Sequence, residues 1–368
     1  MSVSKKHIVL LTSEFPPLPG GIGNHAYNLA EHLVIEGYKV TVIADQRGNG
    51  FEDFEFDKGL KCNLKRVAKT SPRFLMYLKR IRLCFKLLKS ADVFICSGKF
   101  PLWVGAFLEP FHSAERIAII HGTEVNFSDL RLRKSINWSL KRFDKVVAVS
   151  NYTKSLVAYL DLKNIRVIPN GYTIKPLSLD KKTIFELVGE PSLLTVGNVT
   201  KRKGQANVIR HLPKLKALYP GVHYHCIGLE TERQQCEDLA TSLGVLNHIS
   251  FWGHVSESEL VAVYKSAQIF TMLSQTTASG DVEGFGIALI EANHFGLPTI
   301  GAKDCGIEDA ISHGKSGLLI DGTNSEEFVD AVNSILNDRI KYSENAKRWA
   351  KVHDWKTIIK RYVKYIEE

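Results

Sequence analysis

Short apolar runs alternate with longer amphipathic stretches along the whole chain. In the first half, the apolar runs predict strands, and the stretches between them predict helices, for example over residues 24–36 and 152–160. Strands that alternate with helices are typical of a parallel sheet covered on both faces. The strands expected in the first half are His7–Thr12, Lys39–Ala44, Val93–Cys96, Ile117–His121, Lys145–Ser150 and Ile165–Ile168.

The second half repeats this α/β alternation. A chain of 368 residues is too long for one ordinary core and suits two domains. The Pro-Asn-Gly-Tyr segment at 169–172 breaks the pattern, and we expect the link between 170 and 191, a first domain of residues 1–172 and a second of 190–350. The expected strands are Ser192–Val196, His223–Ile227, Ile249–Trp252, Ile269–Leu273, Thr299–Gly301 and Gly317–Ile320, and the expected helices are Ala206–Tyr219, Glu232–Leu243, Glu257–Ser266, Ile287–Phe295 and Glu326–Asn337.

Composition predicts a globular cytoplasmic protein. Hydrophobic residues make up 44% of the chain and charged residues 24%. No apolar run reaches the about 18 residues of a membrane-spanning helix, and the run at His7–Thr12 is too short for a signal peptide. The six cysteines show no CxxC spacing, which favours reduced thiols over a metal site or a disulfide framework.

The net charge of +9 is concentrated in residues 61–90, which hold ten Lys or Arg and no acid. Within them, residues 74–88 predict a basic amphipathic helix. Such a helix can lie on an anionic membrane surface, or it can face the core and leave a basic back in solvent. No nucleic-acid-binding motif accompanies the charge, so we expect no nucleic-acid partner. The apolar positions are Leu75, Leu78, Ile81, Phe85 and Leu88, and the basic ones are Lys79, Arg82, Lys86 and Lys89.

Residues 283–291, Glu-Gly-Phe-Gly-Ile-Ala-Leu-Ile-Glu, carry the strongest chemical signal. Gly284 and Gly286 allow a loop to lie close to a ligand, and the N-terminus of the helix expected next attracts anions. A ligand that touches both Glu283 and Glu291 must span the first helical turn. A sugar nucleotide has that shape, with a diphosphate between its hexose and its ribose.

The loop after the first expected strand supports a different class of protein. Gly21-x-Gly23-x-x-Ala26 matches a dinucleotide-binding fingerprint, and Asp45 follows at a suitable distance. This pattern keeps an NAD-dependent oxidoreductase open as an alternative. In a dinucleotide fold, however, the glycine turn directly follows the strand, whereas here a proline-rich stretch separates Thr12 from Gly21.

Two more polar segments follow expected strands. His121-Gly-Thr-Glu124 lies at the carboxyl end of a first-half strand, where open parallel sheets bind ligands. Gly197–Gly204 follows the first strand of the second half and contains Arg202 and Lys203. A basic turn in solvent is the alternative interpretation of the second segment.

Together these motifs resemble retaining glycosyltransferases of the GT-B fold, specifically glycosyltransferase family 4 (glycosyl transferases group 1), and the likeness covers essentially the whole chain. The resemblance implies two Rossmann-like, doubly wound α/β domains facing each other across a cleft. It also implies that a C-terminal helix, residues 355–368, returns to the first domain. The first domain would then bind the acceptor and the second the nucleotide sugar.

The resemblance also implies residue roles, with His121, Lys203 and Glu283 as the catalytic residues. The family usually has an arginine where this chain has Asn198, and we expect the neighbouring Arg202 to supply part of the missing charge. The acceptor-binding residues would be Asn24, His25 and Glu124. The donor-binding residues would be Gly21, Gly23, Arg202, Lys203, Gly253, His254, Val255, Glu283, Gly284, Phe285, Gly286, Ile287 and Glu291.

The implied reaction moves a hexose from a UDP- or GDP-linked sugar to a hydroxyl of a glycan or lipid-linked acceptor. The anomeric configuration would be retained, without a metal or another cofactor, and the enzyme would be cytoplasmic or peripheral on the inner face of the membrane. Three alternatives stay open at this point. They are another GT-B enzyme such as an epimerase or phosphorylase, a non-catalytic sugar- or lipid-binding module, and the NAD-dependent oxidoreductase.

Overall fold

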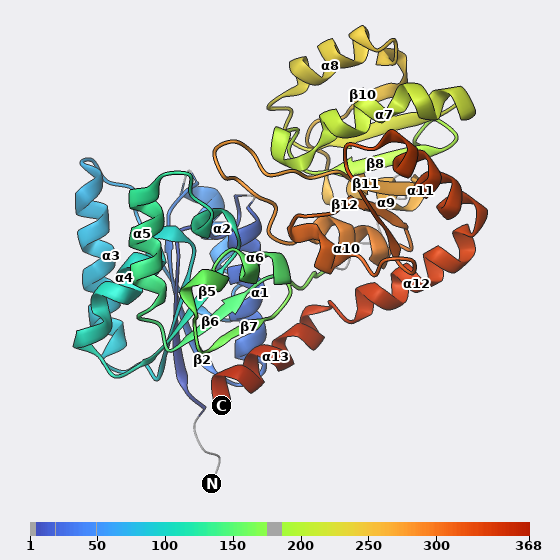
Figure 1. Cartoon of the computed structure of the whole chain (residues 1–368). Coiled ribbons are helices and arrows are strands. Elements are labelled where there is room, and N and C mark those ends of the chain that lie inside the picture. The colour runs from blue at the N-terminus through green and yellow to red at the C-terminus, as the bar shows by residue number, and fades with distance from the viewer. Residues whose placement is uncertain (1–4, 19, 49, 175–185) are drawn as a thin grey trace. The chain divides into compact units, whose positions relative to one another are not determined.

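The structure is a computed structural model that describes residues 5–18, 20–48, 50–174 and 186–368. The chain divides into two compact units (Figure 1). The first comprises residues 1–171 and 355–368, and the second comprises residues 172–354. Part of the expected domain link, residues 175–185, lies outside the described residues.

The first unit is built on a parallel sheet of seven strands in the order β3-β2-β1-β4-β5-β6-β7. The order reverses direction beside β1, as in doubly wound folds, and such a switch point gathers the carboxyl ends of the central strands. The strands are β1 (His7–Thr12), β2 (Lys39–Asp45), β3 (Asn63–Val67), β4 (Val93–Ser97), β5 (Glu115–Ile120), β6 (Lys145–Ala148) and β7 (Ile165–Val167).

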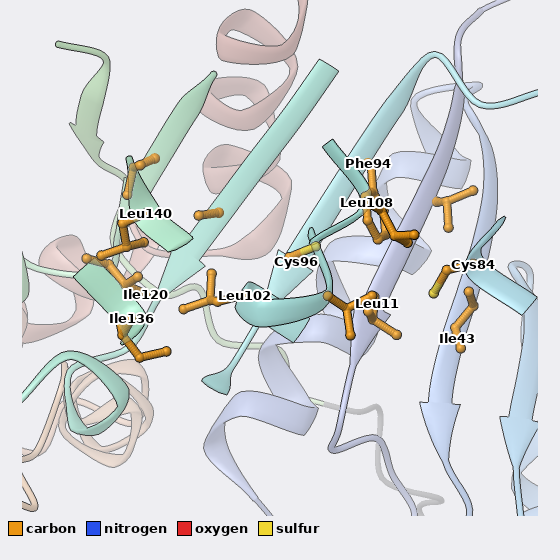
Figure 2. Packing of buried hydrophobic residues seen from close by; sticks show 14 of the residues in the cluster. Leu11, Ile43, Cys84, Phe94, Cys96, Leu102, Leu108, Ile120, Ile136 and Leu140 are labelled. Atoms are coloured by element: carbon orange, nitrogen blue, oxygen red, sulfur yellow. The ribbon is translucent and has the colours of Figure 1, made fainter. Parts of the chain in front are cut away.

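Helices cover this sheet, and the apolar runs of the sequence form its core. Figure 2 shows Leu11, Phe94 and Cys96 of the central strands packed among Leu102 and Leu108. The central strands are buried throughout, which explains why they are continuous apolar runs. The helices are α1 (Gly21–Ile35), α2 (Phe51–Asp57), α3 (Arg73–Leu88), α4 (Lys99–Leu108), α5 (Leu130–Leu140) and α6 (Asn151–Ser155), with the short 3₁₀ turn η1 (Glu109–Phe111) after α4.

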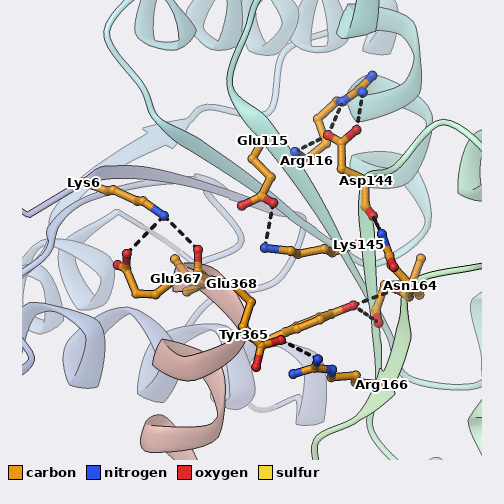
Figure 3. Close-up of polar contacts among 12 residues, drawn as sticks. Lys6, Glu115, Arg116, Asp144, Lys145, Asn164, Arg166, Tyr365, Glu367 and Glu368 are labelled. Atoms are coloured by element: carbon orange, nitrogen blue, oxygen red, sulfur yellow. Dashed lines mark hydrogen bonds and ion pairs between the residues drawn. The ribbon is translucent and has the colours of Figure 1, made fainter.

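The C-terminal helix α13 (Trp355–Glu367) belongs to the first unit, as expected. It packs against α1, with Trp355 and Tyr362 fully buried. Figure 3 shows the end of the helix held by polar contacts: the Tyr365 hydroxyl donates to the Asn164 carbonyl at 2.7 Å, and Lys6 pairs with Glu367 at 3.2 Å. The chain therefore returns to complete the domain in which it began.

The second unit repeats the architecture with a parallel six-stranded sheet in the order β10-β9-β8-β11-β12-β13. Its strands are β8 (Ser192–Val196), β9 (His223–Ile227), β10 (Ile249–Phe251), β11 (Ile269–Met272), β12 (Thr299–Ala302) and β13 (Gly317–Ile320). Its helices are α7 (Gln205–Leu218), α8 (Arg233–Ser242), α9 (Glu257–Ser266), α10 (Ile287–His294), α11 (Ser325–Asn337) and α12 (Arg339–Lys351).

Two features of the first unit differ from the sequence-based expectation. The strand β3 was not predicted, because as an edge strand it has alternating exposed and partly buried positions and no apolar run. The helix α3 forms where expected, but its buried side is Met76, Arg80, Cys84 and Leu88. Of the five positions assigned to its apolar face, Leu75, Leu78 and Phe85 are exposed, and only Leu88 is fully buried.

Among the described residues, no helix combines the length and the apolar character needed to cross a bilayer. All six cysteines are buried and unpaired with one another.

Candidate functional site

Two loops of the second unit meet at the carboxyl edge of its sheet. The turn of residues 197–204 follows β8, and the loop of residues 273–286 follows β11, which is the neighbour of β8. The peptide nitrogen of Gln275 donates to the carbonyl of Arg202 at 3.0 Å, which joins the two loops. The sheet topology therefore brings Arg202 and Lys203 beside the segment that begins with Glu283.

Local hydrogen bonds fix the shape of the basic turn. The Thr200 side chain caps the 3₁₀ turn of residues 201–203 by accepting from the Lys203 peptide nitrogen. The Gln205 amide donates to the carbonyl of Asn198 at 3.1 Å. Gly204 has φ of 79°, and a Cβ there would lie 1.8 Å from the Leu273 carbonyl oxygen, so only glycine fits.

Glu283 is the centre of a cluster of charges. Its carboxylate lies 2.9 Å from the Lys203 ammonium and also pairs with the Arg202 guanidinium. The Arg202 Nε atom lies 3.1 Å from the Asp281 carboxylate. Burial alone would raise the pKa of Glu283, but the charges of Lys203 and Arg202 outweigh burial and hold this pKa below its usual value. Glu283 is therefore an anion with two cations beside it.

Glu291 lies one to two turns into α10 and has a different environment. The Tyr264 hydroxyl donates to its carboxylate at 3.1 Å. Burial raises the pKa of Glu291, and the Tyr264 hydrogen bond and the Lys203 charge oppose this rise. The positive charge of Lys203 thus lowers the pKa of both glutamates.

The N-terminus of α10 adds the anion-attracting end of a helix to this cluster. Gly286 precedes the helix with φ of 81°, and no side chain of the described residues caps this end. A Cβ on Gly286 would lie 2.9 Å from Ile307, so the backbone is packed tightly behind the tip. Peptide N–H groups at such a terminus suit a phosphate oxygen.

The other predicted donor-binding residues have mixed positions. Gly253, His254 and Val255 follow β10 at the same edge of the sheet, and the Gly253 carbonyl accepts from the Gly228 peptide nitrogen at 2.9 Å. Phe285 is 1% exposed and packs on His353, so its ring lies in the core. The remaining members, Gly284 and Ile287, are partly buried beside the Glu283 cluster and at the start of α10.

In the first unit, His121 directly follows β5. Its Nε2 atom lies 2.9 Å from the Ser97 hydroxyl at the end of the adjacent strand β4. Its ring packs edge-on against His25 at 5.1 Å between centroids. His25 is buried, and its Nε2 atom hydrogen-bonds the Tyr362 hydroxyl of α13 at 2.9 Å. His25 therefore joins α1 and α13 to His121, and its side chain is not open to solvent as an acceptor-binding residue would be.

Glu124 supports the loop that carries His121. Its carboxylate accepts from the His121 peptide nitrogen, and the whole residue is 4% exposed. Burial raises the pKa of Glu124 to about 7, against the lowering effect of its backbone hydrogen bonds. Glu124 is therefore mainly a structural partner of the His121 backbone.

The glycine loop of the first unit gives little support to the oxidoreductase alternative. The helix α1 begins at Gly21, earlier than the predicted residue 24, so Gly21, Gly23 and Asn24 all lie in its first turn. Asp45, which would have to bind a ribose, is paired with the buried Arg80. That pairing occupies the carboxylate on which the dinucleotide interpretation depends.

Sequence reasoning missed Ser97 and Tyr264, the side chains that hydrogen-bond His121 and Glu291. Each is remote in sequence from its partner and reaches it through the fold. The sequence did contain a signal for Ser97. This residue ends an apolar strand, and in a parallel sheet that strand is expected beside the one that His121 follows. Tyr264 lies on α9 and carried no such signal.

We expect the His121 imidazole to stay neutral between pH 5 and 8, because burial lowers its pKa from 6.5 to about 4. The unfolded chain takes up this proton first as the pH falls, so the free energy of unfolding should decrease from about pH 6.5 down to about pH 4. Histidine NMR titration measures the pKa of His121 directly, with His121→Gln to assign the resonance. A titration step of His121 between pH 6 and 7 would contradict the expected low pKa.

Comparison with known protein families covers both units. The family described as "Glycosyltransferase Family 4" matches residues 19–175, and the one described as "Glycosyl transferases group 1" matches residues 180–352. Similar relatives include the "GDP-mannose-dependent alpha-(1-6)-phosphatidylinositol monomannoside mannosyltransferase" of Mycobacterium tuberculosis, 29% identical over 90% of this chain and 89% of that protein. Another is the GDP-mannose-dependent monoacylated counterpart of Corynebacterium glutamicum, 24% identical over 93% and 91%.

Solved structures share the fold over nearly the full length. HepE from Anabaena, in complex with UDP-glucose, has a TM-score of 0.76 at 18% identity and covers 98% of this chain and 99% of that one. Sucrose-phosphate synthase from Thermosynechococcus elongatus has a TM-score of 0.74 at 17% identity, covering 99% and 98%. The predicted GT-B fold class is confirmed. The chain belongs to glycosyltransferase family 4, the glycosyl transferases group 1, and is a nucleotide-sugar glycosyltransferase of GT-B type.

Proposed function

We propose that this enzyme transfers mannose from GDP-mannose to a hydroxyl of a lipid-linked acceptor, with retention of the anomeric configuration and without a metal ion. The observation that carries the proposal is the cluster of Arg202, Lys203 and Glu283 beside the N-terminus of α10. The printed functions of the relatives favour GDP-mannose over a UDP-linked sugar as the donor.

The second unit holds the donor. The diphosphate lies at the tip of α10, where peptide N–H groups and the helix dipole attract it, and Lys203 and Arg202 neutralise its charge. Glu283 accepts hydrogen bonds from hexose hydroxyls, and Glu291, oriented by Tyr264, accepts them from the ribose. Gly253, His254 and Val255 lie at the same edge of the sheet and are assigned to the nucleobase.

The bond between the sugar anomeric carbon and the phosphate oxygen breaks, and GDP leaves with the electron pair. The acceptor oxygen forms its bond to the same face of that carbon, and its proton passes to the departing phosphate oxygen. Positive charge already fixed near the leaving group stabilises the transition state without reorganisation, and this is often the largest catalytic term. Arg202, Lys203 and the N-terminus of α10 together supply the positive charge that a metal ion provides in other enzymes.

The first unit binds the acceptor. His121 is a neutral imidazole, held by Ser97 and by the loop that Glu124 supports, and it orients the transferred hexose through a hydrogen bond. Asn24 is exposed in the first turn of α1 and contacts the acceptor. His25 acts indirectly, because its buried ring packs on His121 and holds that ring in position.

The enzyme works in the cytoplasm as a peripheral protein on the inner face of the membrane. Its cysteines are all unpaired thiols, as in reducing compartments. Residues 61–90 hold ten cations and no acid, which suits a surface of anionic lipid where a lipid-linked acceptor is found.

The test of this function is turnover of a panel of nucleotide sugars. Purified enzyme is incubated with GDP-mannose, UDP-glucose and ADP-glucose, with and without a phosphatidylinositol-type acceptor, and the released nucleoside diphosphate is measured in EDTA. We expect release from GDP-mannose to exceed that from the other donors by about tenfold or more, and a mannosylated lipid with the α configuration. Binding of NAD with hydride transfer, or sugar binding without turnover, would overturn the proposal.

A further inference from the structure

Glu14 lies two residues after the end of β1, the strand beside which the order of the first sheet reverses. Doubly wound folds bind ligands at the carboxyl ends of the strands beside such a switch point. The Glu14 side chain is 34% exposed, so a ligand at this edge can reach its carboxylate. The proposed function leaves this accessible acid without a role.

Polar contacts join Glu14 to His121 along three neighbouring strand ends. The Thr12 hydroxyl donates to the Glu14 carbonyl at 2.9 Å. Thr12 is the register partner of Ser97 at the end of β4, and the Ser97 hydroxyl lies 2.9 Å from the His121 Nε2 atom. Strands in a sheet are about 4.8 Å apart, so two spacings put the ends of β1 and β5 roughly 10 Å apart. A sugar ring fits between side chains at that separation.

The glycine loop before α1 is packed against Glu14. A Cβ on Gly20 would collide with the Glu14 carboxylate. A Cβ on Gly23, in the first turn of α1, would lie 3.2 Å from the Glu14 carbonyl carbon and 3.1 Å from the Phe15 peptide nitrogen. Glycine at these two positions therefore allows the loop to lie directly against the acid and leaves room for its carboxylate.

Two charged groups lie near this carboxylate. The Arg47 Nη1 atom is 3.6 Å from it and is itself buried, which is too long for a good hydrogen bond and leaves the carboxylate able to accept others. Glu124 is the second group. Burial is the main cause that raises its pKa to about 7, and the negative charge of Glu14 adds to this rise. Glu14 is thus within electrostatic range of the loop that carries His121.

We propose that the Glu14 carboxylate binds a polyol acceptor by accepting hydrogen bonds from its ring hydroxyls, which makes Glu14 a residue that determines acceptor specificity. This step rests on the proposed function and names the acceptor class more closely. An ionised carboxylate accepts hydrogen bonds at two oxygens and donates none. Neighbouring hydroxyls of a sugar or cyclitol ring supply two donors to such a group.

The same chemistry excludes other lipid-linked acceptors. A terminal phosphate, as in a polyprenyl phosphate, presents negative charge and acceptor oxygens, and Glu14 repels it. A lone alcohol supplies one donor and gains less. The polyol ring lies against Glu14 and faces the hexose held by His121, with its reacting hydroxyl between them. Glu14 orients the acceptor and takes no proton, since the proton passes to the departing phosphate oxygen.

The first experiment measures transfer kinetics of the full chain with GDP-mannose and detergent-dispersed phosphatidylinositol, with a polyprenyl phosphate as the competing acceptor class. Glu14→Gln keeps the shape of the side chain and should raise KM for phosphatidylinositol by about tenfold, and Glu14→Ala by about 10–100-fold. The effect on kcat at saturating acceptor should be smaller than the effect on KM. Turnover with the polyprenyl phosphate in preference to the polyol would overturn the proposal.

Two control variants separate acceptor binding from a structural role. Arg47→Gln removes the ion-pair partner of Glu14 and should change KM for the acceptor by less than about threefold. Glu55→Gln removes the same charge from α2, where Glu55 is exposed and pairs with Lys58, and should leave the kinetics unchanged. If Arg47→Gln raised KM as much as Glu14→Gln does, Glu14 would serve only to hold Arg47, and the proposal would fail.

The second experiment needs no turnover. Saturation-transfer NMR with myo-inositol detects polyol binding to the native chain, and we expect Glu14→Ala to abolish the signal and Glu55→Gln to keep it. Equal signals from the native chain and Glu14→Ala would overturn the inference even if transfer is observed. Failure of every nucleotide sugar to react would instead defeat the proposed function and leave the NMR result to decide polyol binding. Thermal unfolding of each variant checks that the fold is intact.

Discussion

Lys203→Ala is expected to lower kcat for nucleoside diphosphate release by about 10²–10³-fold. The Lys203 ammonium lies 2.9 Å from the Glu283 carboxylate and also acts on the pKa of Glu291. Among the described residues it is therefore the cation common to both ends of the proposed donor. Removing it takes away charge stabilisation of the leaving diphosphate, which is greatest in the transition state, so kcat should fall more than affinity.

Lys201→Ala is the matched control, because Lys201 belongs to the same 3₁₀ turn and is exposed. It removes the same charge from nearly the same place and should change kcat by less than about twofold. Steady-state kinetics with GDP-mannose measure both variants. Equal losses would mean that a diffuse positive field suffices, and a native rate for Lys203→Ala would remove the lysine from the mechanism.

Arg202→Ala is expected to lower kcat/KM by about 10–100-fold, the effect of losing one charged hydrogen-bonding partner of the diphosphate. Arg202 contacts both Asp281 and Glu283, so its guanidinium is already held in the cluster. Within the family, the comparable charge usually comes from an arginine at the position of Asn198. We propose that Arg202, on the other side of the turn, supplies part of that charge in this chain.

Asn198→Arg should restore part of the activity lost in Arg202→Ala. Asn198 is exposed and contributes its backbone carbonyl to Gln205, so a longer side chain can be accommodated. Kinetics of the two single variants and the double variant give the coupling between the positions. Asn198→Lys in the same background tests whether the planar guanidinium is required. Additive losses would show that the two positions do not substitute for each other.

The sequence located the second-unit cluster well because its parts lie in short, regular motifs. Gly197–Gly204 and residues 283–291 each follow an apolar strand, and parallel topology brings such loops to one edge of the sheet. The partners of these residues were harder to predict. Tyr264 contacts Glu291 from another helix, and no local pattern marks a contact across 27 residues.

The first unit shows the opposite case, where the local pattern predicted a helix correctly but did not determine which of its sides is buried. The helix α3 was predicted over residues 74–88, and it forms over Arg73–Leu88. Hydrophobicity placed Leu75, Leu78 and Phe85 on one apolar face, which could turn either to an anionic membrane surface or to the core. The structure instead buries Arg80, because Asp45 at the end of β2 and the ring of Phe100 receive it. A buried ion pair between remote residues outweighed the amphipathic pattern.

The surroundings of His25 are another feature that the sequence did not indicate. The sequence placed it among acceptor-binding residues, and its neighbours Gly21 and Gly23 do lie in the first turn of α1. The ring itself is enclosed by Trp355, Tyr362 and His121. The contacts with Trp355 and Tyr362 come from a helix more than 300 residues away, as the hydrogen bond of His25 to Tyr362 across 337 positions illustrates.

The sequence by itself determined the two α/β units and the strands that form continuous buried apolar runs. It also determined the basic turn of residues 197–204 and the acids Glu283 and Glu291 beside their glycines. These follow from periodicity and backbone constraints, which act over a few neighbouring residues. Only the tertiary structure decided which charges pair, which side of α3 faces outward, and which residues hold His121. Burial and ion pairing depend on what the fold brings near a group, and that information is distributed over the whole chain.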